Sequence, residues 1–235
     1  MSTFLLRIDD VLRGGGWTTE SAHAVRALAW LVAYLALFGL VYGGAMGTFR
    51  GFAGEPQWQI VAGQALFSAV KVPLLLVVTF LISLPPFFVL NTLLGLRRDF
   101  AQAVRALVAT QAALAIILAS FFPFTILWYV SITHYQAAIL FNALMFAVAS
   151  FAAQWLLRGY YGPLIARDRR HRWLLRSWLA VYAFVGIQMG WVLRPFIGCP
   201  NSPLQFFREH AWGDRNAYVV VARLIREVAG EWFGG

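Results

Sequence analysis

The sequence has little charge for its length. Only 12% of its 235 residues are Asp, Glu, Lys or Arg, about half the usual share, and a soluble domain could not cover its surface with so few. Cysteine is nearly absent too: Cys199 stands alone, which excludes a disulfide scaffold. The chain instead has 60% hydrophobic residues and many aromatics, which excludes intrinsic disorder. These features predict a membrane protein with several passes.

Five apolar runs are long enough to cross a membrane as helices, because about 20 residues span a hydrocarbon core of roughly 30 Å. The third run is too long for one straight span and contains Pro123, so we predict a kinked or broken helix there. The predicted fold is an all-α bundle of about five transmembrane helices. The runs cover residues 27–46, 72–94, 103–132, 137–157 and 178–193.

Positive charge is unevenly distributed around these runs. The net charge of +9 comes from 18 arginines and one lysine, Lys71. Twelve of the arginines precede the first run, lie between runs two and three or at the start of run three, or lie between runs four and five. Because cytoplasmic loops collect Arg and Lys, we predict a cytoplasmic N-terminus and an extracytoplasmic C-terminus in a cell inner membrane.

Three regions are therefore expected along the chain. The first carries apolar residues at helical spacing opposite charged ones, which predicts an amphipathic helix on the inner membrane surface. An apolar stripe over residues 216–232 predicts a helix in the tail as well. The regions are the cytoplasmic N-terminal segment 1–26, the transmembrane domain 27–194 and the extracytoplasmic C-terminal tail 195–235.

Acidic side chains are missing from all five runs. Proton- and sodium-coupled transporters keep a carboxylate within the membrane, so coupled transport of that kind is not expected. The four histidines, His23, His134, His171 and His210, lie on different segments without metal-ligand spacing, and no histidine is near Cys199 in the sequence. We therefore expect no metal, no cofactor and no enzymatic activity.

Two runs carry glycines at four-residue intervals. They are Gly39, Gly43 and Gly47 in the first run and Gly186 and Gly190 in the fifth. This G-x-x-x-G pattern lets two helix backbones approach closely. One interpretation is packing within the chain. The other, which we carry into the expected function, is a docking face for another subunit.

Three prolines mark places where a span can bend. Pro85 and Pro86 lie inside the second run and Pro123 inside the third, and each removes an amide donor from its helix. The bend is either a static kink or a hinge. On the second interpretation, a broken helix at Pro85–Pro86 would line a cavity.

Two groups of side chains are predicted to anchor lipid or a partner protein. The cytoplasmic group lies next to the membrane, so anionic phospholipids rather than nucleic acid are its expected partners. In the outer group, Arg194 either reaches lipid phosphates from the aromatic belt or offers a bidentate fork held by Pro195. The groups are Arg169, Arg170 and Arg172 inside, and Trp191, Arg194 and Arg208 outside.

Two stretches carry a family resemblance. Residues 191–200 have the pattern W-x-L-R-P-F-x-G-x-P, and residues 71–91 read KVPLLLVVTFLISLPPFFVLN. Both are similar to segments of uncharacterised bacterial polytopic membrane proteins, which implies the same membrane setting and no particular activity. The five-span layout also resembles that of Yip1-like membrane proteins, whose members act in membrane organisation and trafficking.

Three functions are compatible with these observations. The leading expectation is a non-enzymatic integral subunit or scaffold of a larger membrane complex, which docks other membrane proteins through its glycine-rich helix faces and its outer tail. The alternative is a channel or transporter that moves a small solute through the Pro85–Pro86 cavity. A third possibility is a protein that holds lipid headgroups with Arg194.

Overall fold

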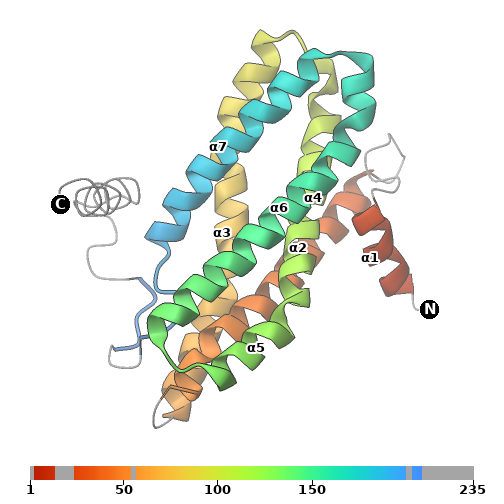
Figure 1. The fold of residues 1–235 in the computed structure, drawn as a ribbon. Coiled ribbons are helices and arrows are strands. Elements are labelled where there is room, and N and C mark those ends of the chain that lie inside the picture. Colours follow the sequence, from red (N-terminus) through yellow and green to blue (C-terminus); the bar gives the residue numbers. More distant parts are fainter. Residues whose placement is uncertain (1–2, 14–23, 54–56, 200–202, 208–235) are drawn as a thin grey trace, which may run out of the picture.

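The computed structural model describes residues 3–13, 24–53, 57–199 and 203–207, and every regular element in them is a helix (Figure 1). The predicted all-α class is confirmed. The predicted helix over 216–232 and the anchoring residue Arg208 lie outside the described residues. In chain order the elements are α1 Thr3–Arg13, α2 Ala24–Gly47, η1 Thr48–Gly51, α3 Trp58–Leu93, η2 Arg97–Asp99, α4 Phe100–Ser120, α5 Phe122–Ser131, α6 Tyr135–Arg167 and α7 Arg170–Val192.

Four helical segments are long and apolar enough to cross a membrane. They are Arg26–Gly51, Trp58–Leu93, Arg97–Ser131 and Tyr135–Arg167, and they correspond to the first four predicted spans. The fifth, α7, has 23 residues but is less apolar, because arginines occupy its first two turns. The chain is therefore a multi-pass α-helical membrane protein, and the membrane crossing of α7 stays a prediction.

The helices form a single elongated bundle (Figure 1). In it α2 packs against both α3 and α4, α7 packs chiefly against α3, and α6 packs chiefly against α4. The last two helices run antiparallel and are joined by a short turn at Asp168 and Arg169, yet they make few contacts with each other. This weak contact between α6 and α7 is the feature that creates the candidate site.

The glycines of α2 are buried against α3 of the same chain. A Cβ added to Gly47 would lie 2.6 Å from the Cα of Ala65, and one added to Gly43 would lie 2.8 Å from the Cα of Ala69. A Cβ on Gly39 would lie 3.1 Å from the Cβ of Pro73. The expected docking face for another subunit is therefore corrected: the α3 backbone already occupies it.

Helix α3 continues through its prolines without a break. It runs from Trp58 to Leu93 with Pro73, Pro85 and Pro86 inside it. Near the proline pair, the hydroxyl of Ser83 donates to the carbonyl of Thr79 at 2.7 Å. The hinge interpretation, with a broken helix at Pro85–Pro86, is therefore corrected: α3 is continuous there, and both prolines lie on its exposed side.

The third span does break where its proline predicts. Helix α4 ends at Ser120 and α5 begins at Phe122, with Pro123 in the first turn of α5. Proline suits that position because a first-turn amide has no carbonyl partner within its helix. The third run is therefore two successive helices rather than one bent helix.

The predicted amphipathic helix is present as α1. Its Val11 is completely buried, and the hydroxyl of Tyr160 on α6 donates to the Val11 carbonyl. On its exposed side Arg13 pairs with Asp9 at 2.7 Å. Helix α1 therefore packs on the bundle through its apolar face, beside α4 and α6.

Candidate functional site

Two adjacent cavities lie between α3, α6 and α7. Their volumes are about 530 and 500 Å³, both within the usual range for ligand pockets. They share the wall residues Leu75, Ala143, Phe146, Gly186 and Ile187, so together they form one elongated depression. We call it the α6–α7 groove. Its walls are mostly apolar, as expected for a site that receives an apolar chain.

Small residues keep the groove open. A Cβ added to Gly190 would meet no atom within 4 Å, and one added to Gly186 would reach only the Thr79 methyl, at 3.5 Å. On α6 the facing residue, Ala143, is exposed. The second predicted glycine pair therefore borders empty space rather than a neighbouring backbone.

A buried polar network holds α6 away from α7 and against α2 and α5. The amide of Asn142 donates to the Tyr129 hydroxyl at 2.7 Å and accepts from the Tyr42 hydroxyl at 3.2 Å. Tyr129 donates in turn to the carbonyl of Met46 at 3.3 Å. Asn142 also lines the first cavity, so its hydrogen-bonded side chain forms a fixed part of the groove wall.

The segment after α7, residues 194–199 and 203–207, folds back onto α3. We call it the post-α7 segment. Lys71 donates to the carbonyl of Pro195 at 2.6 Å, and both Ser68 and Gln64 donate to the carbonyl of Phe196. These three α3 side chains are 1% exposed or less. The beginning of the predicted tail is therefore attached to the bundle.

Lys71 is the residue that sequence reasoning missed. From the sequence, Lys71 contributes only to the net charge, yet its side chain is completely buried beneath the post-α7 segment. Its ammonium group lies 4.9 Å from the centre of the Phe206 ring, which is favourable cation–π geometry. The available signal was its rarity, because it is the one lysine beside 18 arginines and it begins an apolar run.

Arg194 lines the first cavity and stacks on a tryptophan. Its guanidinium carbon lies 3.2 Å from the centre of the Trp191 ring, and its Nε donates to the Trp191 carbonyl at 3.1 Å. The same pairing occurs twice more, with Arg158 over Trp155 and Arg176 over Trp173, both at 5.3 Å. The sequence contains the signal as a W-x-x-R pattern at 155, 173 and 191, which the sequence interpretation overlooked.

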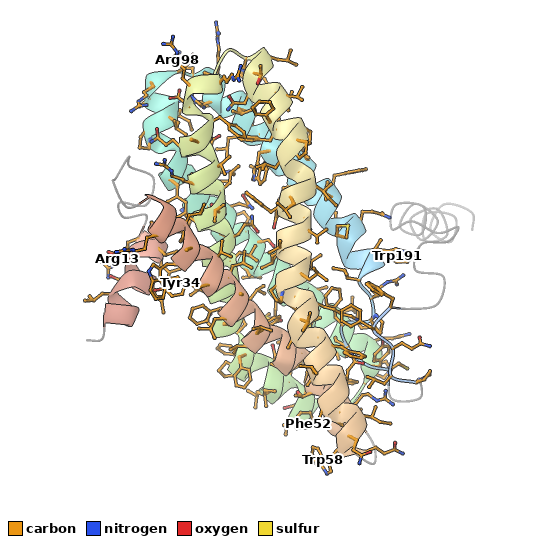
Figure 2. The ribbon with its side chains drawn as sticks, turned by 180° about the vertical axis from the view of Figure 1, so that it is seen from behind. Arg13, Tyr34, Phe52, Trp58, Arg98 and Trp191 are labelled. Carbon is orange, nitrogen blue, oxygen red and sulfur yellow. The ribbon has the colours of Figure 1, made fainter. Side chains whose placement is uncertain are left out.

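The arginines of the α6–α7 turn lie far from the groove. Figure 2 shows Arg98, in the neighbouring η2, at one end of the bundle and Phe52 and Trp58 at the other. Arg170 donates to the carbonyl of Leu94 at 3.2 Å, which satisfies the end of α3. The other two predicted anchors, Arg169 and Arg172, are exposed. Asp99 pairs with Arg167 at 3.4 Å and with His171 at 3.2 Å.

The structure thus brings together only part of the predicted site. Gly186, Gly190 and Arg194 all line the groove, with Trp191 beside Arg194. Pro85 and Pro86 line neither cavity. Within the described part of the chain, no group of three or more His, Cys, Asp or Glu residues is placed to hold a metal ion.

No family model, curated protein or solved structure matches this chain. The resemblance to uncharacterised bacterial membrane proteins and to the Yip1-like layout therefore stays an expectation. Any functional conclusion has to come from the geometry of the groove.

Proposed function

We propose that this protein is a non-enzymatic, multi-pass membrane protein that holds the apolar chain of a membrane amphiphile in the α6–α7 groove. The observation that supports this is the pair of contiguous cavities with Gly186, Ile187, Ala143 and Phe146 in their common wall. Ala143 and Ile187 are exposed. A chain could therefore enter sideways from the bilayer.

Packing, rather than transfer from water, would bind such a chain. Lipid tails are as apolar as leucine, so a chain that leaves the bilayer for the groove gains no hydrophobic free energy. It gains contacts with walls that would otherwise face a void, each contact contributing about 0.1–0.2 kcal/mol. A groove of this kind retains a chain by shape, and its polar end has to provide selectivity.

The proposed location is a bacterial inner membrane, with the N-terminus cytoplasmic. Support comes from the position of the arginine-rich segments: η2 and the α6–α7 turn are adjacent, since Arg170 contacts Leu94 and Arg167 contacts Asp99. Clustered positive charge at one end of a bundle is typical of the cytoplasmic side. Anionic phospholipids remain the proposed partners of these exposed arginines.

The role of subunit or scaffold in a larger complex is retained only as a second use of the same groove. The α2 glycine face no longer supports it, because α3 covers that face. The Gly186–Gly190 edge could instead receive one helix of another membrane protein. The experiment below separates the two occupants.

A photoreactive phospholipid tests the proposal. We would reconstitute the full chain with a phosphatidylcholine that carries a diazirine midway along one chain, irradiate it, and map the modified peptides by mass spectrometry. We expect labelling to be enriched at Phe146 and Ile187. The internal comparison is Leu140 and Phe151, which lie on α6 together with Phe146. They are 70% and 71% exposed and would report ordinary bilayer contact.

A variant with a filled groove tests whether the label is bound there. Gly190→Leu occupies the open space beside α7, so groove labelling should fall about tenfold, equivalent to ~1.4 kcal/mol. Gly162→Leu is the matched control, because its new side chain also enters open space but lies outside both cavities. Equal labelling of Phe146 and Leu140 would refute lipid binding. Crosslinks to a copurifying protein at Phe146 would favour a partner helix.

A further inference from the structure

We infer that the second cavity of the α6–α7 groove binds the hydroxyl group of an uncharged long-chain lipid, whose apolar chain extends towards Gly190. The inference rests on the proposed function, since it names the class of amphiphile that the groove would hold. Neutral hydrogen-bonding side chains gather at the end of this cavity that lies away from the first one. They are Thr79 on α3, Ser150 and Gln154 on α6, and Tyr182 on α7.

The spacing along three helices places these side chains at one end of the groove. Leu75 on α3, Phe146 on α6 and Gly186 on α7 belong to the wall that both cavities share. About one helical turn further towards the α6–α7 turn, the wall of the second cavity becomes polar on each of these helices. The residues at those positions are Thr79, Ser150 and Tyr182.

Two of the polar side chains contain buried atoms without a partner. Neither the hydroxyl of Thr79 nor the amide oxygen of Gln154 makes a hydrogen bond within the described part of the chain. Thr79 is only 2% exposed. In a membrane an unpaired polar group costs free energy, because no water replaces the missing partner. A ligand that supplies a hydrogen bond there would bind more tightly than a plain apolar chain.

The polar end favours a ligand group that donates a hydrogen bond. The hydroxyl of Tyr182 gives its own proton to the amide oxygen of Gln111 on α4, at 2.6 Å, so the Tyr182 oxygen can only accept. The amide oxygen of Gln154 is an acceptor as well. A hydroxyl group matches these acceptors because it carries a donor, which an ester or a ketone lacks.

The second cavity is uncharged as well as polar. None of the described residues that line it is Asp, Glu, Lys or Arg. A phosphate or an ammonium group would have no counter-charge there, and burying an unpaired charge costs far more than burying a neutral group. Phosphatidylcholine could therefore place a chain in the groove but not its headgroup in this cavity.

The rest of the groove accommodates the apolar part of the same molecule. Helix α6 lines it from Ile139 to Gln154, a rise of about 22 Å. On the facing helix, Gly186 and Gly190 leave space beside the backbone. A lipid whose hydroxyl group occupies the polar end can thus run its chain through both cavities.

Two photoreactive probes with the same chain test the inference. One is a long-chain alcohol with a diazirine midway along the chain, and the other is its methyl ether, which accepts but cannot donate a hydrogen bond. The full chain would be reconstituted in phosphatidylcholine vesicles with a trace of either probe, and labelling at Phe146 and Ile187 would be normalised to that at Leu140. We expect the alcohol to label the groove about five times more than the ether, within the range of one neutral hydrogen bond.

Substitution of Gln154 locates this preference. Gln154→Leu should bring the alcohol-to-ether ratio close to one while labelling by the ether persists. Gln136→Leu is the matched control, because Gln136 is an exposed glutamine on the same helix that lines neither cavity. Its ratio should stay at the wild-type value.

Thr79→Val tests the α3 side of the cavity with a side chain of similar shape. We expect the ratio to fall about twofold. The matched control is Thr110→Val, since the buried Thr110 hydroxyl donates within α4 and Thr110 lines neither cavity.

The outcomes separate the inference from the proposed function. A ratio near one in the wild type, or an unchanged ratio in Gln154→Leu, would overturn the inference and leave the groove proposal standing. Absence of groove labelling by both probes would overturn the inference too. If photoreactive phosphatidylcholine also failed to label the groove, the proposed function would be refuted with it.

Discussion

The contact between α2 and α3 and the contact between α6 and α7 both lie beside glycines at four-residue intervals, but the backbones meet only in the first. Gly43 and Gly47 leave no room for a Cβ against α3, whereas Gly190 faces open space. Glycine spacing therefore permits a close approach without enforcing it. What each helix is attached to elsewhere decides the outcome.

The attachments differ between the two pairs. Helix α7 is drawn towards α3, because Trp178 packs edge-to-face on Phe87 at 5.2 Å and the post-α7 segment is bound to Lys71. Helix α6 is drawn towards α2 and α5 by the network around Asn142. With the two helices held on opposite sides, the space between them stays open, and Gly186 and Gly190 border it.

The largest expected effect is at the closed interface. Gly43→Leu would force α2 and α3 apart, since even a Cβ would lie 2.8 Å from the Ala69 Cα. We expect a loss of at least about 3 kcal/mol in the free energy of unfolding, measured by denaturant titration in mild detergent. Gly159→Leu, whose Cβ meets no atom within 4 Å, should unfold like the wild type. A stable Gly43→Leu protein would show that the two helices can separate cheaply.

The next effect concerns the anchor that holds α7 on the side of α3. Lys71→Met keeps most of the side-chain length but removes the donor to Pro195, a charged hydrogen bond worth about 1.5–3 kcal/mol. We expect about tenfold faster modification of Cys199 by a membrane-impermeant maleimide. Cys199 is the natural probe, because it is the one cysteine in the sequence and lies in this segment. An unchanged rate would mean that Ser68 and Gln64 hold the segment without Lys71.

A smaller loss is expected on the α6 side. Asn142→Leu removes the amide that joins Tyr42 and Tyr129, and hydrogen bonds within membranes average about 0.6 kcal/mol each. With two inter-helix bonds lost, the free energy of unfolding should fall by about 1–2 kcal/mol. Tyr42→Phe, which removes only one of them, should lose about half as much. Equal losses in both variants would show that Tyr129 does not depend on Asn142.

The smallest effect is expected in the open groove. Gly190→Leu places its side chain in empty space, so the free energy of unfolding should change by no more than about 0.5 kcal/mol. The same substitution is expected to suppress lipid labelling. The contrast with Gly43→Leu is the direct test of the comparison, and a large destabilisation by Gly190→Leu would indicate that the groove closes in the membrane.

Much of the fold could be predicted from local patterns. The apolar runs that match α2, α3, α4 with α5, and α6 were visible because the membrane demands a continuous apolar stretch. Pro123 marked a real break, whereas α3 continues through Pro85 and Pro86. Membrane helices can contain proline in their interior. A proline alone does not reveal which case applies.

The candidate site could be predicted less well. The sequence patterns indicated an anchor at Arg194 and a docking face at Gly186 and Gly190. The structure shows all three along one groove. Lys71 stands out in the sequence only by its rarity, which does not reveal its role. Its role depends on a contact with Pro195, 124 residues further along the chain, and no local pattern records a contact of that separation.

The sequence by itself determined that this chain is helical, that at least four of its segments suit a bilayer, and that its positive charge is concentrated in particular loops. These properties follow from the length of the apolar runs and from the distribution of arginine, both of which can be read locally along the chain. Only the tertiary structure decided which glycine stripe is closed and which borders a groove. It also decided that Lys71 is buried beneath the segment that carries Arg194. Such outcomes depend on which helices meet, because a side chain's surroundings are set by partners that are distant in the sequence.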